Sequence, residues 1–206
     1  MFIINCKNYE EIAGEKIIKL AKIAEKISKK YKIKIAIAPP YHLIPLITKF
    51  GIIVLAQHLD DKKVGSTTGF MIPEIIKKSK IDGSIINHSE HRITESEIKN
   101  LVKRLKKLKL KTIVCVKNVS EAKKYAKINP TFIAIEPPEL IGTGRAISTE
   151  KPQLITNSIN AVFIACERYD FPLHSFSAMI KHQTTNTCYR PFDVYCFYNT
   201  LYFSLL

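Results

Sequence analysis

The chain has 206 residues, of which 46% are hydrophobic and 24% are charged, and its formal net charge is +14. This composition is typical of a globular protein and excludes a disordered or fibrous chain. No apolar run approaches the roughly 18 residues of a membrane-spanning helix, and the first residues lack the features of a secretion signal. The five cysteines include no CxxC pair. We therefore expect a cytoplasmic protein with no membrane segment, no disulfide framework and no metal site.

Up to about Val162, short apolar runs rich in β-branched residues alternate with amphipathic segments. The runs are almost continuously apolar, which is typical of strands buried on both faces of a parallel sheet. We predict strands at residues 2–5, 33–38, 52–56, 83–87, 112–116 and 132–136.

Most of these runs are separated by segments with the spacing of an amphipathic helix. In the first such segment Ile17, Leu20, Ala21, Ala24 and Ile27 share one face, and lysines occupy the other. The segment from residue 98 to residue 108 repeats this arrangement. Strand and helix alternate about six times, which predicts an α/β fold with a parallel sheet and helical crossovers.

The positive charge lies entirely within residues 1–162, because the acidic and basic side chains of residues 163–206 balance. Lysines greatly outnumber arginines and fall on the solvent faces of the predicted helices. We favour the interpretation that they form solvated helix surfaces. Nucleic-acid binding through residues 103–111 is the sharper alternative, but neither an arginine cluster nor interleaved aromatic residues support it.

Polar side chains follow three of the predicted strands at the point where each strand ends. Asn5 closes the first strand and Lys7 follows it, His88 follows the fourth, and Glu136 closes the sixth. Because chemistry in parallel α/β folds gathers at the C-terminal ends of the strands, these side chains can face one pocket. Taken singly, each has a plainer explanation as a surface lysine, a core or capping histidine, or a helix cap.

Several motifs, in this order and spacing, resemble triosephosphate isomerase and in particular its archaeal form. The most specific feature is NHSExR followed about 45 positions later by EPPELIGTG. The motifs that carry the resemblance are INCKNY (4–9), AQHLD (56–60), GSTTG (65–69), INHSEHR (86–92), TIVCV (112–116) and IEPPELIGTG (135–144).

This resemblance, which covers about residues 1–162, implies a TIM (β/α)8-barrel type of fold. It also implies the interconversion of dihydroxyacetone phosphate and D-glyceraldehyde 3-phosphate through an enediolate, a step of glycolysis and gluconeogenesis. The substrate is then a small phosphosugar, and no cofactor is needed. The resemblance further implies a homo-oligomer, a tetramer or a dimer, in which Thr68 and Gly69 lie in a loop that reaches across the subunit interface.

The same resemblance assigns roles to the residues at the strand ends. Glu136 is the base, His88 polarises the carbonyl oxygen, Lys7 stabilises the developing negative charge and holds the phosphate, and Asn5 contacts the substrate. We interpret Ser89 and the residue after it as a helix start. The N–H groups there would favour a neutral imidazole at His88.

The segment that follows Glu136 has prolines at one end and glycines at the other, which predicts a hinged lid. By resemblance, the backbone near Ile141, Gly142 and Gly144 meets the substrate phosphate. Glu90 and Arg92 are expected to make supporting polar contacts. Cys115 also matches a family cysteine, and we expect it to contribute packing.

Residues 163–206 contain no glycine and most of the aromatic side chains, and they match no part of the family. A complete member has glycine-containing turns after strands seven and eight, which donate N–H groups to the substrate phosphate. The abrupt change favours a shifted reading frame, with a fused or replaced segment and a divergent but folded barrel end as alternatives. In the first two cases we expect about six β/α units, an unclosed sheet with exposed edges and impaired catalysis.

Two other functions compete with the isomerase. One is a non-catalytic basic α/β protein that binds nucleic acid or an acidic partner. The other is a different phosphosugar enzyme on the same barrel, which the joint presence of the histidine and glutamate motifs argues against.

Overall fold

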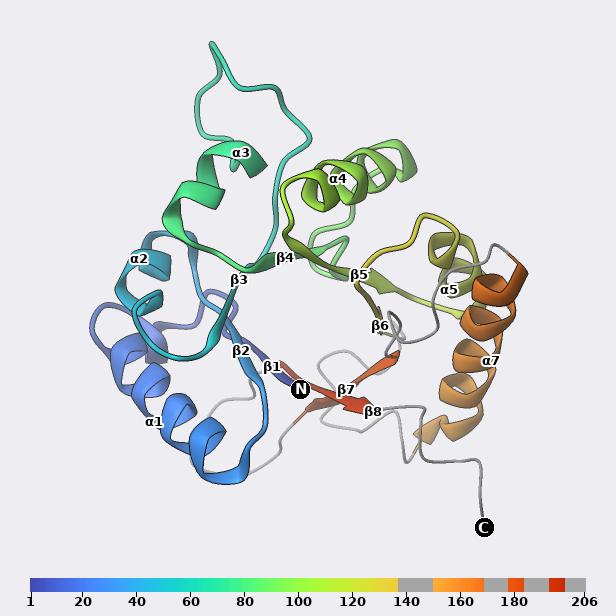
Figure 1. The fold of residues 1–206 in the computed structure, drawn as a ribbon, viewed down its shortest axis with the longest axis horizontal. Coiled ribbons are helices and arrows are strands. Elements are labelled where there is room, and N and C mark those ends of the chain that lie inside the picture. Colours follow the sequence, from blue (N-terminus) through green and yellow to red (C-terminus); the bar gives the residue numbers. More distant parts are fainter. Residues whose placement is uncertain (137–149, 169–177, 184–192, 199–206) are drawn as a thin grey trace.

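A computed structural model describes residues 1–136, 150–168, 178–183 and 193–198. Six parallel strands follow one another around a barrel, each hydrogen-bonded to the next (Figure 1). The fold class predicted from the sequence is confirmed, and the strands fall within two residues of their predicted limits. They are β1 (Phe2–Asn5), β2 (Ile35–Ala38), β3 (Ile53–Ala56), β4 (Gly83–Ile86), β5 (Lys111–Val116) and β6 (Phe132–Ile135).

Helices lie outside this arc of strands (Figure 1). In the described ranges, three short 3-10 turns accompany them, at Glu10–Ile12, Tyr41–Leu43 and Lys77–Ser79. The helices are α1 (Lys16–Tyr31), α2 (Ile44–Ile47), α3 (Pro73–Ile76), α4 (Glu95–Lys107), α5 (Val119–Ala126) and α7 (Pro152–Arg168).

The apolar faces of the two long N-terminal helices pack on the sheet as their spacing predicts, with one exception. In α4 the buried residues are Ile98, Leu101, Val102 and Leu105. In α1 the predicted face is buried at Ile17, Ala21 and Ala24. Ile27 differs, because its side chain is 38% exposed near the end of the helix.

The strands are apolar throughout because both of their faces are covered. One set of side chains fills the barrel interior, and the alternate set packs against the helices. The interior cluster comprises Ile3, Ala36, Ala38, Leu55, Ile85, Ile113, Cys115 and Ala134. A single glycine is required by close strand packing: a Cβ atom on Gly83 would lie 2.3 Å from the carbonyl oxygen of Lys111.

Two further strands complete the circle, which differs from the expected unclosed sheet. β7 (Ala178–Gln183) runs parallel to β6, whereas β8 (Asp193–Tyr198) runs antiparallel to both β7 and β1. Although the segment lacks glycine, its valine, tyrosine and phenylalanine residues favour extended backbone. The described part of the chain has no helix after α7, so it shows six β/α units followed by the parallel strand β7 and the reversed closing strand β8.

Among the described residues, no helix is both long and apolar enough to cross a membrane.

Candidate active site

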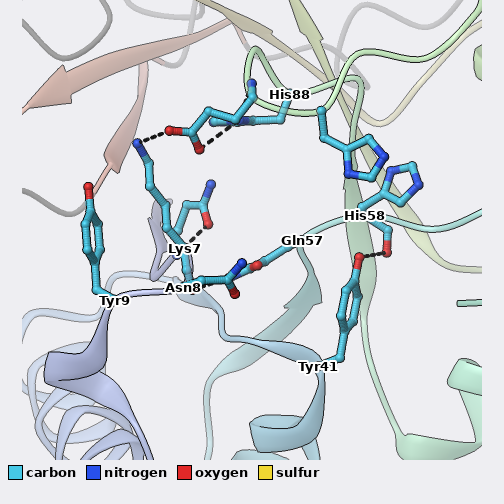
Figure 2. Close-up of a pocket in the computed structure, with 10 residues that line it drawn as sticks. Lys7, Asn8, Tyr9, Tyr41, Gln57, His58 and His88 are labelled. Atoms are coloured by element: carbon cyan, nitrogen blue, oxygen red, sulfur yellow. Dashed lines mark hydrogen bonds and ion pairs between the residues drawn. The ribbon is translucent and has the colours of Figure 1, made fainter. Parts of the chain in front are cut away.

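The C-terminal ends of β1, β4 and β6 bring the three predicted catalytic side chains to one end of the barrel. His88 Nε2 lies 3.1 Å from Glu136 Oε1. Lys7 Nζ lies 2.7 Å from Glu90 Oε1, and Glu90 Oε2 is 3.5 Å from His88 Nδ1. Lysine, histidine and glutamate are therefore linked through a chain of polar contacts, part of which is drawn in Figure 2.

Lys7 is held in a backbone conformation that a lysine seldom adopts. Its φ is +50°, in the left-handed region. The Asn5 side chain accepts a hydrogen bond from the Lys7 amide at 3.1 Å. On the other side, the Gln57 amide nitrogen donates to the carbonyl oxygens of Lys7, at 2.8 Å, and of Ala38, at 3.1 Å. Two side chains thus clamp the backbone that carries the ammonium group.

His88 lies in a turn, and the predicted helix start at Ser89 is wrong. The turn closes with a hydrogen bond from the His91 amide to the His88 carbonyl at 2.8 Å. The helix α4 begins later because Thr94 is its N-cap, in a capping box with Glu97 that satisfies the first backbone N–H groups. At the turn itself, the Glu90 amide donates a hydrogen bond to His88 Nδ1 at 3.2 Å.

The turn that carries His88 is braced from β5. Asn87, at φ +61°, has a left-handed backbone that asparagine tolerates well. Its side chain donates to the Cys115 carbonyl at 2.9 Å and accepts from the Ile93 amide at 3.2 Å. Arg92 also donates to the Cys115 carbonyl, at 3.4 Å, and pairs with Glu121 at 3.5 Å.

The Glu136 side chain is completely buried. Besides the His88 ring, it accepts a hydrogen bond from the Ser89 amide through Oε2 at 2.9 Å. A buried carboxylate with fixed donors is well placed for proton transfer, because little water competes for it. Glu136 does not line the cavity next to His88. Its carboxylate therefore lies behind the imidazole as seen from that cavity.

A cavity of about 410 Å³ opens in front of Lys7 and His88. His58 and His91 both line this cavity, and their rings stack with centroids 3.9 Å apart. Burial, followed by the proximity of His91, lowers the pKa of His58, although Asp60 opposes this shift. The cavity is lined by Asn5, Lys7, Asn8, Tyr9, Tyr41, Gln57, His58, His88, Glu90 and His91, drawn in Figure 2.

Tyr41 fixes the base of the loop between β3 and α3. Its hydroxyl donates to the His58 carbonyl at 2.9 Å, and burial raises the pKa of this phenol. Sequence reasoning assigned no role to Gln57 or His58, although both stand in the AQHLD motif directly after β3. Their position after a strand was the signal that could have identified them.

The remaining predicted residues lie outside this cavity or outside the described part of the chain. Ile141, Gly142 and Gly144, with the predicted lid, lie outside the described residues. Thr68 and Gly69 are exposed in the loop that projects from the barrel between β3 and α3 (Figure 1). Cys115 is buried in the barrel interior, in the packing position expected for it. Within the described ranges, no group of three or more His, Cys, Asp or Glu side chains is arranged to hold a metal ion.

A parallel β/α sheet with a carboxylate, an imidazole and an ammonium group at its C-terminal edge defines a barrel protein of the TIM type with a site suited to proton transfer. Comparison with known proteins agrees. The family model for triosephosphate isomerase matches residues 1–168. The chain therefore belongs to the triosephosphate isomerase family.

Archaeal triosephosphate isomerases are among its relatives. The protein of Cenarchaeum symbiosum is 48% identical over 162 residues, which cover 79% of this chain and 73% of the relative. The protein of Methanocaldococcus jannaschii is 40% identical over 163 residues, covering 79% and 74%. The protein of Saccharolobus solfataricus is 39% identical over 163 residues, covering 79% and 72%.

Proposed function

We propose that this chain carries the proton-transfer site of a triosephosphate isomerase, which interconverts dihydroxyacetone phosphate and D-glyceraldehyde 3-phosphate. The observation that carries the proposal is the contact of the buried Glu136 carboxylate with the His88 imidazole, beside a cavity that Lys7 enters. An enediolate needs a base for a carbon-bound proton, a donor for the oxygens and a cation for the negative charge.

Glu136 is the base in this proposal. Its carboxylate is held by the Ser89 amide and the His88 ring. To reach a substrate in the cavity, the side chain must leave the Ser89 amide and rotate past the imidazole. Exclusion of water around the rotated carboxylate then keeps it basic.

His88 acts as a neutral hydrogen-bond donor. Because the Glu90 amide donates to Nδ1, this nitrogen is an acceptor and the ring proton resides on Nε2. The Nε2–H group is then available to the substrate oxygens once Glu136 rotates away. A neutral ring can pass this proton between the two substrate oxygens, and the histidine does not first have to lose a proton.

Lys7 supplies the positive charge. Its ion pair with Glu90 keeps the ammonium at the cavity, and the clamp by Asn5 and Gln57 fixes the backbone below it. The cavity volume of about 410 Å³ lies within the usual range for small-ligand sites. A phosphate dianion would replace the carboxylate as the partner of Lys7.

The rest of the assignment completes this proposal. Ile141, Gly142 and Gly144 would close over the phosphate as part of a lid. The projecting loop with Thr68 and Gly69 would contact a second subunit in a cytoplasmic homo-oligomer. We treat residues 1–162 as the barrel region and residues 163–206 as a tail that replaces the last two β/α units. Because phosphate binding lowers the barrier as well as the KM, we expect kcat far below that of a complete relative.

Two assays separate the parts of this proposal. Turnover is measured with both triose phosphates, and exchange of the substrate carbon-bound proton in D2O is followed by NMR. We expect exchange that Glu136→Gln and His88→Gln abolish, while His42→Gln, an exposed histidine, leaves it unchanged. Absence of exchange and of triose phosphate binding in the unmodified chain would refute the proposed function. Turnover within about tenfold of a complete relative would refute the claim that the tail impairs catalysis.

A further inference from the structure

The two ends of the barrel differ in how their charges are balanced. At the end that holds the cavity, acidic and basic side chains occur together in the loops after the strands: Glu10, Glu11, Glu15, Asp60, Asp61 and Glu90 with Lys7, Lys62, Lys63, Arg92 and Lys117. At the opposite end, the chain enters each strand from a helix, and these connections are rich in lysine. We call Lys32, Lys34, Lys49, Lys80 and Lys109 the basal lysines.

The basal lysines are all exposed, and within the described part of the chain none of them forms an ion pair or a side-chain hydrogen bond with a carboxylate. They precede β2, β3, β4 and β5, which are neighbours in the sheet, so their backbones lie along one arc. Two carboxylates lie at these connections. Asp82 accepts a hydrogen bond from the Val54 amide at 2.8 Å, and Glu25 of α1 accepts one from the Gly51 amide at 3.0 Å and pairs with Lys29. Because other groups engage both carboxylates, the arc carries an excess of positive charge.

Three basal lysines occupy positions where a lysine is unfavourable. Lys32, Lys80 and Lys109 have φ values of +52°, +60° and +57°, in the left-handed conformation that glycine or asparagine usually provides. At the corresponding position before β6 the chain has Asn129, at φ +53°. A cation near a helix C-terminus is favourable, but this effect does not explain Lys34 or Lys49, which follow the helix ends by two or more residues.

We propose that the arc of basal lysines binds the phosphate backbone of single-stranded nucleic acid, at the end of the barrel opposite the cavity. Neighbouring strands are about 4.8 Å apart, so the arc over four strands is roughly 14 Å long, or about four phosphates at 3.4 Å each. Binding of this kind is independent of sequence. It does not depend on the isomerase site, since no basal lysine lines the cavity.

This surface differs from residues 103–111, which were the candidate patch of the nucleic-acid alternative in the sequence. In that segment Arg104 is engaged by Asp61, at 2.8 Å, and by Glu74, at 2.6 Å. Its guanidinium therefore braces the projecting loop instead of facing an external anion. Of that segment, Lys109 belongs to the basal arc. A membrane surface fits less well, because stable binding there needs exposed apolar side chains interleaved with the charges. Within the basal connections the apolar side chains are buried or only partly exposed, although Tyr31, the last residue of α1, is exposed.

The test measures binding of a fluorescein-labelled 20-residue oligothymidylate by anisotropy over about 50–200 mM salt. Four phosphate contacts to a single strand predict a slope of log K against log salt near −2.8, hence an affinity loss of roughly 50-fold over this range. Replacing Lys32, Lys80 and Lys109 by asparagine removes three charges while keeping a residue that tolerates the left-handed conformation. We expect the slope to fall in magnitude by about 2.

The matched control replaces Lys16, Lys19 and Lys22 on the exposed side of α1 by glutamine, which removes the same net charge. We expect its slope to stay within about 0.5 of the original. Equal losses in the two triple variants would overturn the proposal, because binding would then follow net charge alone. So would absence of binding at 50 mM salt, or binding to phosphatidylserine vesicles without binding to the oligonucleotide. Proton exchange at the isomerase site should be the same in all three proteins.

Discussion

Replacing Gln57 by leucine tests how the backbone of Lys7 is held. The change removes the two hydrogen bonds from the side-chain amide to the carbonyls of Lys7 and Ala38. Each is worth about 1 kcal/mol net, and a partly buried carbonyl left without its donor adds to the loss. We therefore expect Gln57→Leu to lower the free energy of unfolding by about 2–3 kcal/mol.

Urea denaturation followed by circular dichroism measures this loss. With a slope of about 2 kcal/mol per M, the unfolding midpoint should fall by roughly 1–1.5 M. Gln153→Leu is the matched control. It replaces the same side chain by leucine, but at an exposed position of α7. We expect the control to shift the free energy by less than about 0.5 kcal/mol.

A double-mutant cycle with Lys7→Gly isolates the effect on the backbone. Glycine relieves the left-handed conformation at residue 7, which costs a lysine about 1–2 kcal/mol. In the Gln57→Leu variant the two hydrogen bonds are absent and the backbone at residue 7 can relax. Lys7→Gly should therefore raise the free energy of unfolding by less in that variant than in the original protein. A coupling energy of about 1 kcal/mol is expected. Coupling indistinguishable from zero, or a loss below 0.5 kcal/mol for Gln57→Leu alone, would refute the reasoning.

Three further predictions concern groups around the site. Because burial lowers the pKa of His58, the folded state binds this proton less readily than the unfolded chain. The free energy of unfolding should therefore fall as pH drops below about 6.5, and His58→Phe, which retains an aromatic ring for stacking on His91, should flatten that dependence in urea titrations at pH 8 and pH 5.5. Arg104→Met removes the ties to two carboxylates, so amide hydrogen exchange in the loop 57–72 should quicken by at least about tenfold, and an unchanged rate would count against the bracing role. Burial raises the pKa of the Cys6 thiol to about 12, so iodoacetamide at pH 8 should leave the Cys6 peptide unmodified in the folded protein and label it in urea, as peptide mass mapping can show.

The strands and the three catalytic candidates were predictable because each depends on local sequence. A strand covered on both faces must be apolar throughout, and a polar residue directly after it must lie at the edge of the sheet. Glu136 follows β6 directly, and Lys7 and His88 stand two residues beyond the ends of β1 and β4. The helix start at Ser89 misled because a serine followed by a glutamate is a common cap, whereas Thr94 with Glu97 forms the real one.

Other features depend on contacts that no local pattern encodes. Gln57 acts on a residue 50 positions earlier, and the stacking of His58 on His91 joins two loops. The direction of β8 also cannot be read from local sequence. Its valine and aromatic residues favour extended backbone but say nothing about orientation, which follows from pairing with strands at the two ends of the arc.

The reversed strand also bears on the order of folding. Neighbouring pairs from β1 to β6 connect segments separated by one β/α unit, whereas closure pairs Phe2 with Cys196. Loop-closure entropy delays contacts of such long sequence separation. We expect the six-strand arc to assemble first and the ring to close last, leaving β1 and β6 as open edges while the chain is still being synthesised. A chaperone that shields sheet edges would then act on this protein during that interval.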